Sequence, residues 1–155
     1  YQNLVDNSPI NQSNPSITWP DFSLGRASVR SLIPKNTTVI DAVSKVLPNI
    51  KKKITCFSYR VPIDTVASAD LTLNIKKKIN LEILKIFLRN QVKKSEHIEI
   101  NNNSLVSVDY IKSNKSAIID DQWTKVNANT VKLVLWYDNE WGYANTICKL
   151  IKLIK

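Results

Sequence analysis

The sequence predicts an α+β fold in which a mostly antiparallel sheet carries helices on one face. Segments with the two-residue period of strands outnumber segments with the 3.6-residue period of helices. Several neighbouring strand segments are joined by links too short for a helical crossover, which favours antiparallel pairing. The chain has 155 residues, of which 43% are hydrophobic and 23% are charged, and this suits one globular domain with its own core.

The chain is expected to begin with an irregular lead-in, residues 1–25, followed by a folded domain, residues 26–155. The lead-in is rich in Asn, Ser and Pro and shows no period. The first residue is Tyr1 rather than Met, so we expect either a processed chain or the back half of a longer one.

The folded part is predicted to alternate short helices with strands. A first helix begins after Thr37 or Thr38, either of which can cap it, and stops at Pro48. Asn80 can cap a second helix. The predicted elements are a helix over 38–47, strands over 54–61 and 66–76, a helix over 81–92, strands over 105–110, 116–120 and 131–137, and a helix from about 140 onward.

The net charge of +9 raises the question of nucleic-acid binding, but the types of basic residue argue against it. The bases are 18 Lys against 4 Arg, and many of the lysines stand in pairs or triplets typical of a solvated surface. Modules that read nucleic acids favour Arg interleaved with aromatic residues. We therefore expect neither a nucleic-acid partner nor, in the absence of a long apolar run, a membrane partner.

Two cysteines, Cys56 and Cys148, are far apart and match no metal-ligand spacing, so no metal site is predicted. Cys56 falls in a predicted strand and Cys148 on the apolar face of the last helix, so both are expected to be buried and inert. Unpaired cysteines favour a reduced, cytoplasmic setting. The single histidine, His97, is expected in a loop before a strand.

The residues from Leu135 to Asn145 crowd aromatic, acidic and amide side chains into the junction between a strand and the last helix. Such a junction is costly for folding unless it binds something, since it combines a strand end with a helix start. It is the first candidate site in the chain.

That junction is the last of several short motifs spread along the chain. The others are Arg26-Ala27-Ser28, Ser31-Leu32-Ile33-Pro34, Ala42-Val43-Ser44-Lys45-Val46-Leu47-Pro48, Arg60-Val61-Pro62, Asp70-Leu71-Thr72 and Ser107-Val108-Asp109-Tyr110. In order and spacing, from Arg26 to the end, the chain resembles the catalytic (C-terminal) domain of the glyceraldehyde-3-phosphate dehydrogenase family.

The resemblance implies an NAD-dependent oxidation of a phosphorylated aldehyde by a cytoplasmic homotetramer. It assigns the substrate phosphate to Arg60, Thr37 and Thr38, residue types that supply a bidentate cation and hydroxyls at a helix N-terminus. It assigns the nicotinamide carboxamide to Asn139, whose amide can donate and accept at once. It places Tyr143 beside the nicotinamide ring.

The resemblance also implies that the catalytic pair is missing. The family's nucleophilic cysteine and its N-terminal Rossmann domain lie upstream of residue 1, and the family histidine falls before or within the first residues. No catalytic residue is therefore predicted in this chain, which by itself is expected to be inactive.

Within the family, several residues favour the D-erythrose-4-phosphate dehydrogenase branch, which makes 4-phosphoerythronate for pyridoxal 5'-phosphate biosynthesis. They are Thr38 and the runs Leu105 to Tyr110, Ser116 to Asp120, Lys125 to Asn127 and Val134 to Trp136. The alternative is a fragment of the glycolytic glyceraldehyde-3-phosphate dehydrogenase. A non-catalytic remnant of either is the third possibility, because residues 21–26 depart from the family pattern.

Overall fold

The computed structural model describes residues 32–154. The chain divides into two compact units, Tyr1–Asp64 and Thr65–Lys155. The expected lead-in over 1–25 and the motif at Arg26 lie outside the described residues.

The first unit is a small two-stranded ribbon with a helix between its strands. Strand β1 (Ile33–Lys35) pairs antiparallel with β2 (Ser58–Arg60), and α4 (Val39–Val46) and the 3₁₀ helix η2 (Pro48–Ile50) lie between them in sequence. The prediction of this helix is confirmed, with the stop at Pro48. The strand predicted over 54–61 keeps three residues only.

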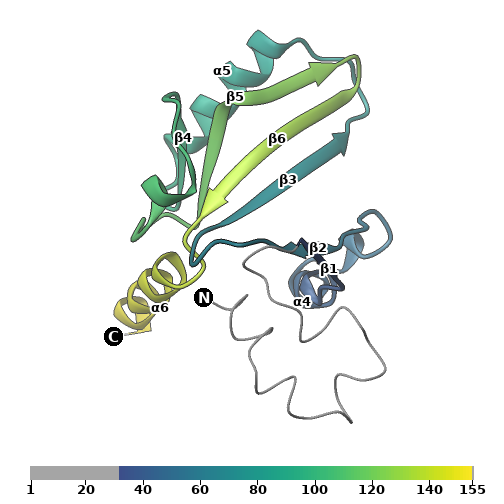
Figure 1. The fold of residues 1–155 in the computed structure, drawn as a ribbon. Helices are drawn as coiled ribbons and strands as arrows, with labels where there is room; N and C mark the ends of the chain where they lie inside the picture. Colours follow the sequence, from purple (N-terminus) through teal and green to yellow (C-terminus); the bar gives the residue numbers. More distant parts are fainter. Residues whose placement is uncertain (1–31, 155) are drawn as a thin grey trace. The chain divides into compact units, whose positions relative to one another are not determined.

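The second unit is built on a four-stranded mixed sheet with the order β3-β6-β5-β4. Its strands are β3 (Ala67–Asn74), β4 (Ile98–Asn101), β5 (Ala117–Asn127) and β6 (Thr130–Tyr137). The pairs β3–β6 and β5–β6 are antiparallel, whereas β4 and β5 run parallel. The predicted α+β class is confirmed: the sheet is mostly antiparallel and carries a parallel strand at one edge (Figure 1).

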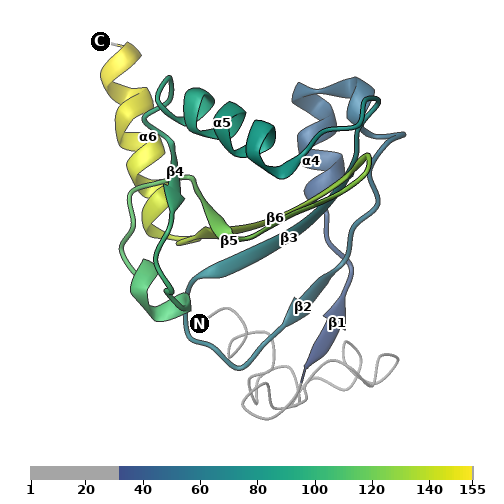
Figure 2. The same ribbon diagram turned by 90° about the horizontal axis from the view of Figure 1, so that it is seen from above.

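Helix α5 (Leu81–Val92) covers one face of this sheet (Figure 2). Its inward residue Leu84 is 7% exposed and packs with Val131 and Leu133 of β6. The helix begins as predicted, because the Asn80 carboxamide oxygen accepts a hydrogen bond of 2.8 Å from the Ile83 amide. Lys85 secures the helix by a 2.8 Å ion pair with Asp121 of β5.

The strand predicted over 105–110 is wrong, because these residues form the 3₁₀ helix η3 (Ser107–Tyr110). The Asp109 carboxylate accepts a 2.8 Å hydrogen bond from the Val106 amide, which stabilises a helical turn rather than an extended chain. The strand in this region is β4, which begins at Ile98, eight residues before Val106. The sequence analysis did not predict it.

The opposite face of the sheet holds a buried polar network. Asp120, which is 1% exposed, accepts a 3.0 Å hydrogen bond from the Trp136 indole. The Trp136 ring stacks on Tyr110 with centroids 5.3 Å apart, and the Tyr110 hydroxyl accepts a hydrogen bond from Asn101. Burial and the nearby Asp120 carboxylate raise the pKa of Tyr110, so the phenol remains a neutral part of the core.

The last helix, α6 (Trp141–Ile154), exposes the apolar face on which Cys148 was expected to be buried. Ile147, Ile151 and Ile154 on that face are 38%, 53% and 78% exposed. Cys148 is therefore exposed, and so is Cys56, which lies in the irregular segment before β2. Both predictions of buried cysteines are wrong. Over the described residues, no helix has the length and apolar character needed to cross a membrane.

Candidate functional site

The centre of the strand-to-helix junction is Asp138, which follows β6 and is 5% exposed. One carboxylate oxygen accepts hydrogen bonds from the amides of Glu140 (2.9 Å) and Trp141 (2.7 Å). The other accepts a 2.8 Å bond from the Lys112 amide. A single side chain thus caps the start of α6 and ties it to the loop after η3.

These bonds determine the charge state of the carboxyl. Burial by itself raises the pKa of Asp138, but the hydrogen bonds from the Trp141, Lys112 and Glu140 amides lower it by more. The net pKa lies below the ordinary value, so the carboxyl is ionised at neutral pH and holds its three amides as charge-assisted bonds.

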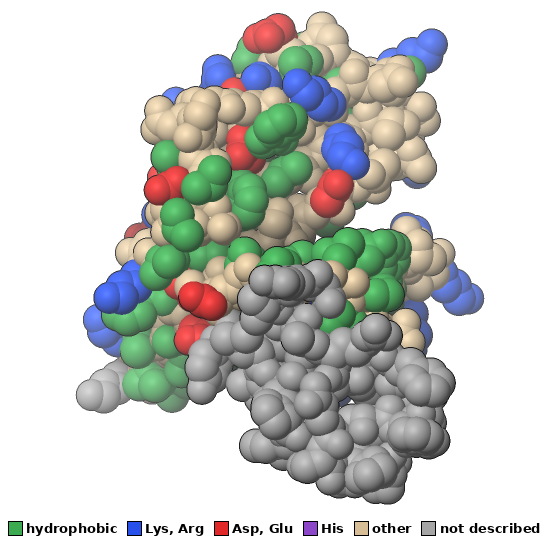
Figure 3. All heavy atoms as spheres, in the orientation of Figure 1, with side chains coloured by type: hydrophobic (Ala, Val, Ile, Leu, Met, Phe, Trp, Pro, Cys, Tyr) green, Lys and Arg blue, Asp and Glu red, His purple; other side chains and the backbone are tan. Residues whose placement is uncertain are grey.

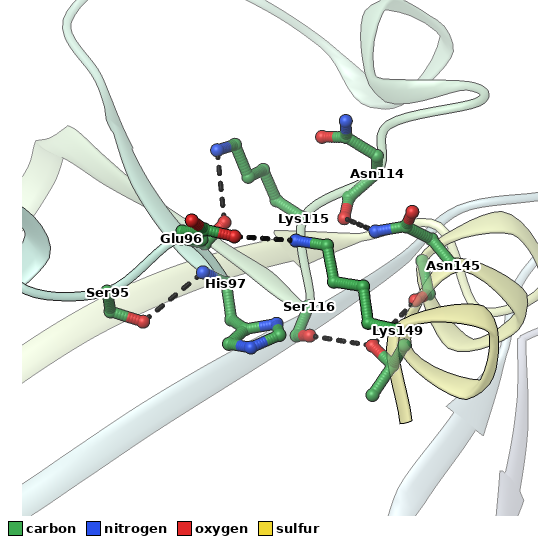
Figure 4. Close-up of polar contacts among 10 residues, drawn as sticks. Ser95, Glu96, His97, Asn114, Lys115, Ser116, Asn145 and Lys149 are labelled. Atoms are coloured by element: carbon green, nitrogen blue, oxygen red, sulfur yellow. Dashed lines mark hydrogen bonds and ion pairs between the residues drawn. The ribbon is translucent and has the colours of Figure 1, made fainter. Parts of the chain in front are cut away.

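The first turns of α6 are fixed further by close backbone approach. A Cβ built on Gly142 would lie 2.6 Å from the Lys115 carbonyl oxygen, so only glycine fits there without a shift. The side-chain amide of Asn145 donates a 2.9 Å hydrogen bond to the Asn114 carbonyl, and the Lys149 ammonium lies 3.3 Å from the Glu96 carboxylate (Figure 4). The helix is therefore attached to loops 95–97 and 112–116 by glycine and polar side chains.

The structure brings the two predicted cofactor residues to this turn. The Gly142 amide bonds to the Asp138 carbonyl and the Ala144 amide to the Glu140 carbonyl, so the turn is helical from Asp138 onward. Asn139 and Tyr143 are four residues apart in that turn and so lie on one side of it. Both are exposed, Tyr143 by 68%, and both are available to a ligand.

Two of the predicted substrate residues stand at the start of α4. The Thr37 hydroxyl accepts a 3.3 Å hydrogen bond from the Val39 amide, and the Thr38 carbonyl accepts the first helical bond, from Ala42. The Thr38 side chain makes no capping bond. A hydroxyl that accepts one hydrogen bond still carries a proton to donate, so Thr37 can both cap the helix and bind an anion.

The third predicted substrate residue, Arg60, ends β2 and is half-buried. The register pairs it with Ile33, whereas Thr37 lies beyond the Lys35–Ser58 end of the ribbon. Thr37 and Thr38 are therefore adjacent, and Arg60 must extend its side chain along the ribbon to share a phosphate with them.

The described residues offer no other centre of chemistry. Between residues 32 and 154, no three His, Cys, Asp or Glu side chains are grouped so that they could hold a metal ion. His97 lies in a loop, immediately before the unpredicted strand β4, and its carbonyl oxygen accepts a hydrogen bond from the Ser116 amide. The residue that the sequence analysis missed is Asp138. Aspartate commonly caps helices, and Asp138 stands between a predicted strand and a predicted helix, so the sequence did carry a signal for its role.

Known proteins are similar to most of this chain. Residues 6–139 match the family described as glyceraldehyde 3-phosphate dehydrogenase, C-terminal domain. The chain is 35% identical over 134 residues to glyceraldehyde-3-phosphate dehydrogenase of Pseudomonas aeruginosa, covering 86% of this chain and 40% of that protein. It is 39% identical over 134 residues to the cytosolic enzyme of Mesembryanthemum crystallinum, covering 84% and 40%.

The chain belongs to the C-terminal domain family of glyceraldehyde 3-phosphate dehydrogenase. It spans about two fifths of the length of the relatives it matches.

Proposed function

We propose that this chain is the substrate-phosphate and nicotinamide-side part of an NAD-dependent dehydrogenase of phosphorylated aldehydes. The observation that carries the proposal is the turn built on Asp138, which presents Asn139 and Tyr143 to solvent in a fixed geometry. Such a turn is costly to build and buries neither side chain, which is the expected pattern of a ligand contact.

The residues of this turn suit the group they would hold. A carboxamide on Asn139 pairs with the nicotinamide carboxamide by donating one hydrogen bond and accepting another. The Tyr143 ring offers an apolar face against which a nicotinamide ring can pack. NAD, when bound, accepts a hydride from the substrate; the part of this chain is to orient the ring that receives it.

The start of α4 and Arg60 suit a phosphate. Arg60 supplies a planar guanidinium for two parallel hydrogen bonds, and Thr37 supplies a hydroxyl at a helix N-terminus, where the peptide dipoles favour an anion. Thr38 adds a backbone amide and an exposed hydroxyl. These groups would bind substrate without touching the bond that reacts.

Glyceraldehyde 3-phosphate is the substrate that the relatives favour, because the Pseudomonas aeruginosa and Mesembryanthemum crystallinum relatives carry the name glyceraldehyde-3-phosphate dehydrogenase. This supports the alternative above over the erythrose 4-phosphate branch. Erythrose 4-phosphate is kept as the second candidate on the residues Thr38, Val108 and Tyr110. The remaining chemistry, the cytoplasmic homotetramer and the Rossmann domain belong to the full-length protein that we propose.

A chimera tests the proposal. The N-terminal portion of the Pseudomonas aeruginosa relative, joined ahead of this chain, should reduce NAD with glyceraldehyde 3-phosphate. Asn139→Ala should raise the KM for NAD, and Arg60→Ala should raise the KM for the aldehyde, with little cross-effect. A soluble, tetrameric chimera without activity towards either phosphorylated aldehyde would contradict the proposal and favour a non-catalytic remnant.

A further inference from the structure

The position of helix α6 is set by few contacts. Among the residues of the helix only Gly142 is buried, and apolar side chains over α6 lie at the molecular surface (Figure 3). The helix is held instead by the Asp138 carboxylate before it and by polar contacts, most of them with the loop of residues 112–116. The course of this loop therefore decides where the turn with Asn139 and Tyr143 lies.

Successive positions of the loop contact the start of α6. The Lys112 amide donates a 2.8 Å hydrogen bond to the Asp138 carboxylate. The Asn114 carbonyl accepts a 2.9 Å bond from the Asn145 side chain (Figure 4), and the Lys115 carbonyl oxygen lies against the first turn of the helix. The first of these contacts is made by the residue at which the loop begins.

The loop is directed by the backbone of Lys112, which is left-handed. Its φ is 63°, a conformation that residues with a Cβ rarely adopt. The chain before it is fixed, because Tyr110 at the end of η3 is 3% exposed and stacks on Trp136. Since φ is the rotation about the bond from the Lys112 nitrogen to its Cα, it decides where residues 113–115 run relative to the amide that Asp138 accepts.

Disfavoured backbone conformations gather at this end of the sheet. Among the described residues, three other than glycine have a positive φ, namely Val66, Lys112 and Ala128. Ala128 stands in the two-residue hairpin loop between β5 and β6, where such a conformation is usual. Val66, which is 4% exposed, directly precedes β3, at the end of the sheet where β6 runs into Asp138. Such conformations persist only where the surrounding structure holds them, and they are frequent at ligand sites.

We propose that Lys112 is a positioning residue that acts through its backbone. Its left-handed conformation directs residues 113–115 onto α6 and so holds Asn139 and Tyr143 in place for a ligand. That this ligand is nicotinamide rests on the function proposed above. The Lys112 side chain is exposed, so the residue can be exchanged without changing the core.

Three variants at this one position separate backbone from side chain. Lys112→Gly keeps the left-handed conformation without a steric cost, Lys112→Ala removes the ammonium, and Lys112→Val adds a β-branched side chain that disfavours the conformation.

Hydrogen exchange in the 155-residue protein measures the turn directly. The Trp141 amide, which bonds to Asp138, should exchange about tenfold faster in Lys112→Val and within about twofold of wild type in the other two variants. The Ile83 amide at the start of α5 is the reference and should not change. An unchanged Trp141 amide in Lys112→Val, or equal acceleration at Ile83, would overturn the positioning role.

Kinetics of the chimera with the Pseudomonas aeruginosa N-terminal portion link the turn to the cofactor. Lys112→Val should raise the KM for NAD several-fold and leave the KM for the aldehyde as it is, and the conservative Lys112→Gly should restore the wild-type values. Equal effects of all three variants would overturn the backbone role and assign the effect to the ammonium.

The proposed function and the positioning role fail in different ways. Faster exchange at Trp141 without a change in the KM for NAD would overturn the link between this turn and the cofactor. If the parent chimera is inactive, the proposed function fails, and exchange at Trp141 still decides whether Lys112 positions the turn.

Discussion

The turn at Asp138 and the ribbon that carries Arg60, which belong to different units, are held in different ways. The turn is fixed by three hydrogen bonds to one buried carboxylate and by a glycine in contact with backbone. The ribbon has three residue pairs, and α4 between its strands has no buried residue. The turn proposed to hold nicotinamide is therefore preorganised by its own unit, whereas the ribbon proposed to hold phosphate depends on few contacts within the described residues.

The largest effect is expected at Asp138. In Asp138→Asn the amide group turns an N–H towards the Lys112 N–H, so one buried donor loses its acceptor, at a cost of about 1–3 kcal/mol. Urea unfolding, monitored by Trp fluorescence, measures this loss in the free energy of unfolding. A cost below about 0.5 kcal/mol, the range of ordinary surface substitutions, would show that the carboxylate does not hold the turn.

The same variant has a defined pH dependence. Because the folded pKa of Asp138 is lowered, its contribution to stability is present above the unfolded pKa of about 3.9 and is lost as pH falls through the folded value. The stability difference between wild type and Asp138→Asn should thus be full at pH 7 and shrink in acid. A difference that grows on acidification would contradict this sign.

The next effect concerns the ribbon. Arg60→Lys keeps the charge and loses the bidentate fork, so binding of a phosphorylated aldehyde should weaken about tenfold, which corresponds to about 1.4 kcal/mol. Arg89→Lys is the control, since Arg89 is 52% exposed on α5. Equal effects of the two variants would show that Arg60 acts only as surface charge.

A smaller effect is expected at Gly142. Alanine is the better helix former by about 1 kcal/mol, but its Cβ would meet the Lys115 carbonyl oxygen, and the strain of such overpacking is about 1–3 kcal/mol. Gly142→Ala should therefore be destabilising by about 1 kcal/mol net and should shift the amide resonances of residues 112–116. A stabilised variant would mean that the helix and this loop are loosely joined.

The smallest effects are expected at the helix caps. The Asn80 cap bond is 2.8 Å and that of Thr37 is 3.3 Å. Asn80→Ala should cost about 1 kcal/mol, and Thr37→Ala should cost less. Hydrogen exchange of the Ile83 and Val39 amides measures how much each substitution destabilises the start of its helix. If Thr37→Ala cost as much as Asn80→Ala, the start of α4 would be as firmly held as that of α5.

The sequence predicted the elements whose signals are local. The Asn80 cap and the apolar period gave α5 with its observed bounds, and Pro48 gave the end of α4. The alternation in residues 71–75 gave β3. In each case the chemistry that fixes the element lies within a few residues of it.

The features that were missed depend on distant contacts. Period alone locates the apolar side of α6, but the attachment of its polar side to Asn114 and Glu96 decides that the apolar side faces outward. The helical turn at Ser107–Tyr110 was set by the Asp109 carboxylate against an apolar, strand-like pattern. For the site, Asn139 and Tyr143 were predicted by resemblance, whereas the acceptor that positions them, Asp138, bonds to Lys112, 26 residues earlier.

The most direct test of the central claim is a pair of NMR titrations of the ¹⁵N-labelled 155-residue protein. D-glyceraldehyde 3-phosphate and unphosphorylated D-glyceraldehyde are added separately. We expect the phosphorylated compound alone to shift the amide signals of Thr37, Thr38 and Arg60. Equal shifts with both compounds, or shifts confined to the lysine-rich segments, would contradict a phosphate site at this ribbon.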